Sequence, residues 1–270
     1  MRPGDDDLPT VAAAAVLAFA SADVAHEVVG HGAGYLAAGG GPCVLTTTRL
    51  IEHRLLGEAG GRIFSVGGPA GNLALAALAL WLLDRRRPAS ATGRWFLWTC
   101  AAFNLMWALG YLIYSGVTAR GDWAELVRGL APPWLWRPAL VVLGLALVRR
   151  ALGALGRRLD SPGGESGAEA SRRAWRLVTA AYLAAGVIAC LAAWPDPRGP
   201  FQIVESAAPE TFLGNLPLLL IPFLAGRPAR RKEPAPAGDA VIARSGAWIV
   251  AAVIAGLILA GVLGPGVEIG

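Results

Sequence analysis

Two histidines and a glutamate stand together in the first apolar stretch of the chain. The segment ADVAHEVVGHGAGYLAAGG (residues 22–40) contains His26, Glu27 and His31, and the whole chain has only three histidines. An ionisable side chain inside an apolar span is costly enough to indicate a function. Imidazoles with a neighbouring carboxylate are typical of zinc hydrolases, in which the histidines bind the metal and the glutamate is the base. The sequence therefore predicts a Zn2+ site here.

The two histidines are one residue further apart than in the HExxH zinc motif. On a regular α-helix, residues four apart differ by about 40° and residues five apart by about 140°. Two arrangements are open. We favour a π-type turn near Gly30, which would return His26 and His31 to one face. Alternatively, Glu27 and His31 bind the metal together and His26 stands outside. The string HEVVGHG resembles the HExxGH motif of the dipeptidyl-peptidase III family, in which both histidines bind zinc.

A catalytic zinc ion needs a third protein ligand and leaves its fourth position to water. The best candidate is Asp122 in TARGDWAEL, just after the third apolar run, and Glu125 is its rival. Antiparallel neighbouring spans would bring Asp122 to the same membrane face as the histidines. Asp23, one helical turn before Glu27, is placed to orient His26 from outside the ligand set.

The elements that must position these residues are membrane spans. Apolar residues make up 55% of the 270 residues and charged residues 16%, and several apolar runs approach or exceed the roughly 20 residues that cross a bilayer. We expect about seven helices, at 9–37, 64–83, 95–117, 134–148, 174–194, 211–225 and 246–263. The predicted fold is an all-α polytopic membrane protein. β-Branched residues around Thr46–Thr48 indicate a short hairpin after the first span, and His53 reads as an exposed residue of the same loop.

Polar segments divide the chain into three expected parts. Residues 1–150 would form a metalloprotease-like membrane core of about four spans, 151–173 a flexible polar linker, and 174–270 a set of about three C-terminal spans. The polar segment 226–240 is a further expected linker. Pro217 and Pro222 indicate a broken helix among the C-terminal spans, which is suited to act as a gate.

The positive charges predict an orientation and exclude one class of partner. The net charge is +5, yet the basic residues are spread among loops without interleaved aromatics, so nucleic acid is not an expected partner. Sixteen of them lie in loops 84–94, 149–176 and 226–245, against seven on the other side. The positive-inside rule places the richer side in the cytoplasm. Composition suggests a bacterial inner or plasma membrane as the location, with the lipid bilayer as the surrounding medium.

The order of these motifs resembles the site-two protease family of intramembrane zinc metalloproteases. GHGAGYLAAGG, VGGPAGNLAL and FNLMWALGYLIYSG followed by GDW match that family's order over about residues 20–125. The resemblance implies that His26, His31 and Asp122 bind zinc and that Glu27 is the catalytic base. It also implies that Asn72, with Gly68 and Pro69, positions a transmembrane or membrane-proximal peptide substrate. That family usually places its site toward the cytoplasm, whereas the charge pattern here places it outward.

Two other functions remain open from the sequence. A metal-binding transporter or sensor would use the same ligands without hydrolysis, but it would need further polar residues along a path across the bilayer. A catalytically inactive protease-like scaffold is favoured by the extra residue between the histidines. Asn72 and Asn104 also have a structural interpretation, since asparagine amides often cross-bond helices in lipid.

Overall fold

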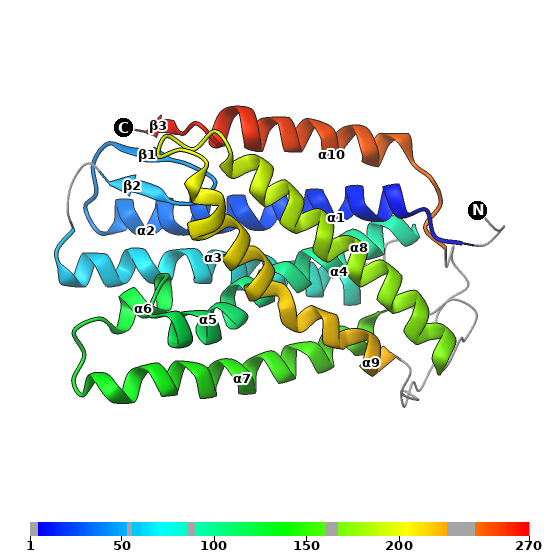
Figure 1. Ribbon diagram of the computed structural model, residues 1–270, viewed down its shortest axis with the longest axis horizontal. Helices are drawn as coiled ribbons and strands as arrows, with labels where there is room; N and C mark the ends of the chain where they lie inside the picture. Colours follow the sequence, from blue (N-terminus) through cyan, green and yellow to red (C-terminus); the bar gives the residue numbers. More distant parts are fainter. Residues whose placement is uncertain (1–4, 53–55, 86–89, 160–166, 226–240, 270) are drawn as a thin grey trace.

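The protein is described by a computed structural model that covers residues 5–52, 56–85, 90–159, 167–225 and 241–269. Within these ranges, seven helices are long and apolar enough to cross a membrane. They are Leu8–Ala37, Glu58–Arg85, Ala91–Thr118, Trp134–Arg158, Ala168–Ala193, Ile203–Leu224 and Gly246–Leu263. Each predicted apolar run corresponds to one of them, so the expected all-α polytopic fold is confirmed (Figure 1). The fourth helix is longer than its apolar run of 134–148.

The first span changes its helical geometry along its length. It begins as α1 (Leu8–Asp23), continues without a break as the π-helix η1 (Val24–His31), and ends as α2 (Gly32–Ala37). The carboxylate of Asp7 caps α1 by accepting from the backbone N–H of Thr10 at 3.0 Å and from its hydroxyl at 2.7 Å. Within the first span, the π-helical geometry is limited to the segment that carries the histidines.

A small antiparallel sheet follows the first span. β1 (Cys43–Leu45) pairs with β2 (Leu50–Glu52), with Val44 opposite Ile51. This confirms the expected hairpin, whereas His53 lies outside the described residues. A third strand, β3 (Val267–Ile269), occupies the other edge of β1. The sequence analysis missed β3, because three residues are too few for a recognisable alternation and their partner lies more than 200 positions away.

The second span, α3 (Glu58–Arg85), packs directly on the π-helix. A Cβ atom at Gly30 would lie 2.5 Å from the carbonyl oxygen of Gly67, and one at Gly71 would overlap the carbonyl of Ala25. Such close backbone contact is typical of small residues at helix interfaces in membranes. Gly30 has no left-handed backbone conformation. Contact with α3, and not the π-turn as we expected, is therefore what requires glycine at this position.

The third span and the segment after it complete the first half of the bundle. Its parts are α4 (Ala91–Leu105), the π-helix η2 (Met106–Gly110), α5 (Tyr111–Thr118) and the short α6 (Asp122–Val127). Between α5 and α6 the backbone turns through left-handed conformations at Ala119 and Gly121, with φ of 57° and 81°. A side chain at Gly121 would overlap the ring of Tyr111. This turn directs the chain back, so that α6 begins next to the bundle.

The later spans include one helix whose geometry changes along its length. α7 (Pro133–Arg158) and α8 (Ala168–Ala193) are regular, as is α10 (Gly246–Ile258), which ends in the π-turn η7 (Leu259–Leu263). The sixth span passes through η4 (Ile203–Ala207), η5 (Pro209–Leu213), η6 (Leu216–Leu220) and α9 (Ile221–Ala225). The expected break at Pro217 and Pro222 is only a change of helix type, because the span stays helical from Ile203 to Leu224.

The expected division into three parts needs correction. Residues 151–158 belong to α7 and residues 168–173 to α8, so only the segment between these helices joins them. The expected linker 226–240 lies outside the described residues. One apolar core also joins the first spans to the last, with buried side chains from α1, α4, α7, α8 and α9, among them Val11, Phe103, Leu155, Val178 and Ile221. The C-terminal spans are thus packed into the same body as the first four spans.

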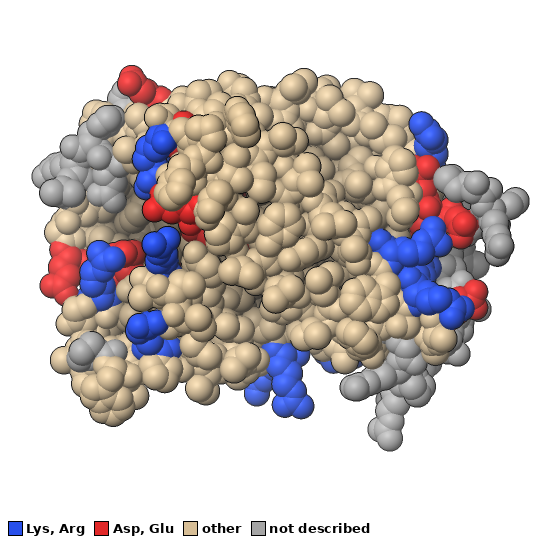
Figure 2. Space-filling model, viewed as in Figure 1, with Lys and Arg blue, Asp and Glu red and all other residues tan. Residues whose placement is uncertain are grey.

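Charged side chains gather toward the two ends of the bundle. Figure 2 shows blue and red atoms mainly at the left and right, with a broad band of other residues between them. The N-terminus lies at one end, and α6, the sheet and the beginning of α3 lie at the other (Figure 1). An apolar band between two charged ends is the pattern of a multi-pass membrane protein.

Candidate metal centre

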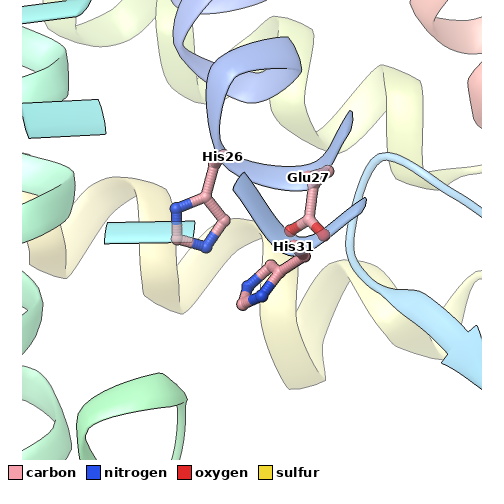
Figure 3. A group of neighbouring side chains, drawn as sticks. All are labelled: His26, Glu27 and His31. Atoms are coloured by element: carbon pink, nitrogen blue, oxygen red, sulfur yellow. The ribbon is translucent and has the colours of Figure 1, made fainter. Parts of the chain in front are cut away.

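The π-helix brings the two histidines together. A π-turn closes its hydrogen bond five residues back, as the backbone N–H of Gly32 does to the carbonyl of Glu27. Residues five apart therefore lie on one side, and the rings of His26 and His31 have centroids only 4.7 Å apart. Figure 3 shows both imidazoles and Glu27 projecting from the same wide turn. The expected wide turn is confirmed, and the straight-helix alternative, in which His26 points away, is wrong.

Asp122 meets both histidines. Its Oδ2 atom lies 3.1 Å from Nε2 of His26 and its Oδ1 atom 3.3 Å from Nε2 of His31. Ligand atoms bound to a tetrahedral zinc ion at about 2.0–2.2 Å are separated from one another by about 3.3–3.6 Å. The three side chains thus stand at nearly the mutual distances of a ligand set. Their exposed fractions are 4%, 5% and 16%, so the site is largely shielded from solvent.

Asp122 is held as an anion. Burial by itself would raise the pKa of this carboxyl group, but the charge of His31 and hydrogen bonds from His26 and His31 lower the pKa well below its usual range. Its rival Glu125 forms an ion pair with Arg128, and its side chain is 42% exposed. Asp122 is therefore the carboxylate of this segment that can serve the site.

In both imidazoles, Nδ1, the ring nitrogen that does not face Asp122, donates a hydrogen bond. Nδ1 of His31 lies 3.0 Å from the carbonyl oxygen of Phe64, which can only accept, so this nitrogen carries the proton. Nδ1 of His26 lies 2.6 Å from Oδ1 of Asn72, which assigns the same tautomer. Nε2 is therefore the nitrogen of each ring that remains to bind a metal, and without a metal a proton on it hydrogen-bonds to Asp122. Both Nε2 atoms face Asp122, as a shared metal would require.

Asn72 is itself fixed by other buried groups. Its Nδ2 atom donates to the carbonyl of Ala22 at 3.0 Å and to Oδ1 of Asn104 at 2.8 Å. Asn104 in turn donates to the carbonyl of Cys100 at 2.8 Å. Asn72 and Asn104 are fully buried. The amide of Asn72 is thus used inside the protein to hold His26, which differs from the substrate-positioning role that the resemblance implied.

Gly68 and Pro69 also serve the site differently from what we expected. A Cβ atom at Gly68 would lie 2.6 Å from Nε2 of His31 and 2.7 Å from Nε2 of His26, so only glycine leaves room for the imidazoles. Pro69 is buried within α3, which runs unbroken from Glu58 to Arg85. Pro69 therefore does not open the helix at this point.

The two carboxylates on the first span, Glu27 and Asp23, differ in their relation to the histidines. Glu27 belongs to the group His26, Glu27 and His31, whose ligand atoms all lie within 4.8 Å of one another. Its Oε2 atom is buried and has no hydrogen-bond partner. Asp23 does not orient His26 as expected, because Asn72 bonds to the outer nitrogen of that ring. The Oδ2 atom of Asp23 is likewise buried without a partner.

Two contributors to the site were not expected from the sequence. Trp107 stacks on His26 with ring centroids 5.4 Å apart and an interplanar angle of 12°, and Phe64 lies against His31 at 4.5 Å. Trp107 is part of the π-helix η2, and although it lies in the segment FNLMWALGYLIYSG, no role at the site was assigned to it. Asn104 was expected only to cross-bond helices, and it does so through Asn72.

Comparison of the chain with models of known protein families, with curated proteins and with solved structures finds no match. The candidate site therefore stands on its own geometry: two histidines of one tautomer, an ionised aspartate between their Nε2 atoms, and a free glutamate beside them.

Proposed function

We propose that the chain is an intramembrane zinc metalloprotease that hydrolyses peptide bonds of membrane-embedded substrates. One observation carries the proposal. Both imidazoles donate through Nδ1, and both Nε2 atoms meet the carboxylate of Asp122 at 3.1 and 3.3 Å. Three protein ligands with an open fourth position are the arrangement of catalytic zinc sites, whereas structural zinc sites are closed by four protein ligands.

The residues divide the chemistry among them. Zinc, when bound, lowers the pKa of a coordinated water to about 7 and polarises a carbonyl group. His26, His31 and Asp122 would hold the ion. Glu27 has an unpartnered buried oxygen next to these ligands, so it can accept a proton from the attacking water and return it to the leaving amine. Asn72 and the carbonyl of Phe64 keep the imidazoles oriented.

The depth of the site supports a membrane-embedded substrate. His31 and His26 precede the end of α2 by six and eleven residues, which corresponds to about 9 and 16 Å along a helix. A substrate must therefore bring its peptide bond below the end of the bundle to meet Glu27. A peptide segment that unwinds within the bilayer can do so from the side.

The structure weighs against the two other functions. A transporter would need polar groups along the whole path, yet between the site and the N-terminal end most of the described buried side chains are apolar, such as Ala14, Ala18 and Leu177, with Thr99 among the polar exceptions. The inactive scaffold was favoured by the extra residue between the histidines. The π-turn absorbs that residue and brings both imidazoles to Asp122, so this reason no longer holds.

The test combines zinc content with proteolysis. Purified protein should hold about one zinc ion per chain, and His31→Ala should lose it. Glu27→Gln should retain zinc but lower cleavage of a model transmembrane peptide by a factor of about 10²–10⁴, because the general base is removed. Zinc content is measured by metal analysis, and cleavage by mass spectrometry of the products.

A matched pair of carboxylates controls this experiment. Asp122→Asn should weaken zinc binding, whereas Glu125→Gln, three residues later on the same helix, should leave it unchanged because Glu125 pairs only with Arg128 among its described ion pairs. If the wild-type protein binds zinc but does not cleave the peptide, the protease function is refuted and a metal-binding role is favoured. Full zinc retention in His31→Ala would refute the metal site itself.

A further inference from the structure

A cavity lies beside Glu27, next to the candidate metal centre. It is a small, partly open cavity between α1, η1, η2, α8, η4, η5, η7 and the turn after β1. Its apolar lining includes Phe19 and Trp107. Glu27 is the member of the proposed catalytic group that lines it. A group placed in this cavity would therefore sit next to the proposed base.

The polar lining of the cavity consists of oxygen atoms. Three carboxylates line it, from Asp23, Glu27 and Glu210, together with the hydroxyl groups of Thr47, Thr48, Ser206 and Thr211. No lysine or arginine is among the described residues of the lining. Arg49, which follows in the same turn, donates to Gln202 at 3.1 Å instead. The cavity therefore has an excess of acceptors and of potential negative charge.

Two of these carboxylates have an oxygen atom with no partner in the protein. Asp23 is 2% exposed and Glu27 6% exposed, and the Oδ2 atom of Asp23 and the Oε2 atom of Glu27 make no hydrogen bond. A buried carboxylate oxygen without a partner is costly, the more so within a bilayer. Asp23 also bonds to no metal ligand, so the metal centre does not account for it. A ligand that carries N–H donors and positive charge would satisfy both oxygens.

We propose that this cavity is a substrate subsite for a guanidinium group, so that preferred substrates carry arginine next to the scissile bond. This inference rests on the proposed protease function. Among the described residues, the group of metal-ligating side chains found close together includes Glu27 but neither Asp23 nor Glu210. The three carboxylates of the cavity therefore do not form a compact site for one small ion. A guanidinium group, with five N–H donors spread over a planar fork, can bridge carboxylates that stand apart.

The experiment compares arginine with citrulline, its neutral isostere. The cleavage site of a model transmembrane peptide is first mapped, and peptides with arginine or citrulline on either side of it are then compared. Wild-type protein in detergent should prefer arginine by about ten- to a hundredfold in kcat/KM, the range expected for hydrogen bonds to a charged group. The same preference should appear in the dissociation constant, measured by fluorescence anisotropy of labelled peptides.

Three variants locate the effect. Asp23→Asn and Glu210→Gln should each reduce the arginine preference, while cleavage of the citrulline peptide stays close to that of the wild type. Glu205→Gln makes the same change five residues before Glu210, outside the cavity, and should leave the preference unchanged. Zinc content and thermal melting establish that each variant is folded. If Asp23→Asn does not fold, Glu210→Gln alone tests the subsite.

The outcomes separate this inference from the proposed function. Equal cleavage and equal binding of the arginine and citrulline peptides would overturn the subsite and leave the protease intact. If the model peptide is not cleaved at all, tighter binding of its arginine version than of its citrulline version would refute the protease but retain a guanidinium-binding cavity. A preference for arginine that survives both Asp23→Asn and Glu210→Gln would place its origin elsewhere and overturn the assignment.

Discussion

At the scale of single residues, the site depends on which nitrogen of each imidazole is free. His26 and His31 both present Nε2 because Asn72 and the carbonyl of Phe64 occupy Nδ1. A carbonyl group accepts only, so the tautomer of His31 follows from the backbone of α3. The two side chains are thereby prepared as ligands in the absence of metal, since neither has to rotate or change its tautomer to bind.

The role of Asn72 can be measured. Asn72→Leu should weaken zinc binding by about 10–100-fold, because partners that orient a histidine ligand are worth this much in metal affinity. The dissociation constant is obtained by competition with a chromophoric chelator. Thr99→Val is the control, since Thr99 is also buried but bonds only to carbonyl groups of its own helix. Equal zinc affinity of Asn72→Leu and wild type would mean that packing alone orients His26.

Gly68 offers a second test at this scale. Gly68→Ala should lower zinc affinity, because the added methyl group would lie 2.6 Å from Nε2 of His31 and displace the ring. Gly61→Ala on the same helix has nothing within 4 Å and should instead stabilise the protein by about 0.5–1 kcal/mol. Zinc titration and thermal melting of the pair measure the two effects. Normal zinc binding by Gly68→Ala would show that the rings have room to shift.

At the scale of elements, the π-helix and α3 form one unit. The wide turn alone would not place the imidazoles. Backbone contact between Gly30 and Gly67 draws α3 close enough for Asn72 and the carbonyl of Phe64 to reach the rings. A π-turn is less stable than an α-helix and is found most often at functional sites. Contact with α3 and the carboxylate of Asp122, which meets both imidazoles, are what hold it here.

The contact between the two helices predicts different effects for two neighbouring glycines. Gly30→Ala should destabilise the protein and reduce its zinc content, because the Cβ atom would meet the carbonyl of Gly67 at 2.5 Å. Gly32→Ala should be tolerated, since its nearest contact would be an ordinary 3.8 Å. Thermal melting with and without zinc distinguishes the variants. If both behave alike, close packing on α3 is not what holds the turn.

At the scale of the whole molecule, the acidic and histidine groups of the site lie toward one end of a bundle whose core is mainly apolar. The sixth span, which changes from π to 3-10 to α geometry, carries Glu210 and Ser206 to the cavity beside Glu27. The C-terminal spans thus contribute directly to the cavity next to the site.

The orientation of the bundle is a prediction at the same scale. Arginines concentrate at the end away from the site, and the positive-inside rule places that end in the cytoplasm. In a chain without native cysteines, Arg128→Cys should react with an impermeant maleimide on intact cells. Ser90→Cys, at the other end, should react only after permeabilisation. The reverse pattern would place the site toward the cytoplasm, the usual side in the family that the motif resembles.

The sequence by itself determined the spans and the histidines, and it favoured a wide turn. Apolar runs of bilayer length permit little besides helices, because backbone groups in lipid must bond within their own segment. The five-residue spacing of His26 and His31 left a regular helix incompatible with a shared site. Asp122 was also found from the sequence, since antiparallel spans bring its segment to the same end. These conclusions depend on local periodicity and length, which a single sequence records.

Only the tertiary structure decided how the site is held. Asn72 was assigned to the substrate and Asp23 to His26, but the packing of α3 against η1 gave the outer nitrogen of His26 to Asn72. Gly68 and Gly30 owe their identity to atoms of another helix. The stacking of Trp107, the cavity shared by Asp23 and Glu210, and the strand β3 likewise join segments far apart in the chain. Distances across helices follow from side-chain packing in three dimensions, which no local pattern encodes.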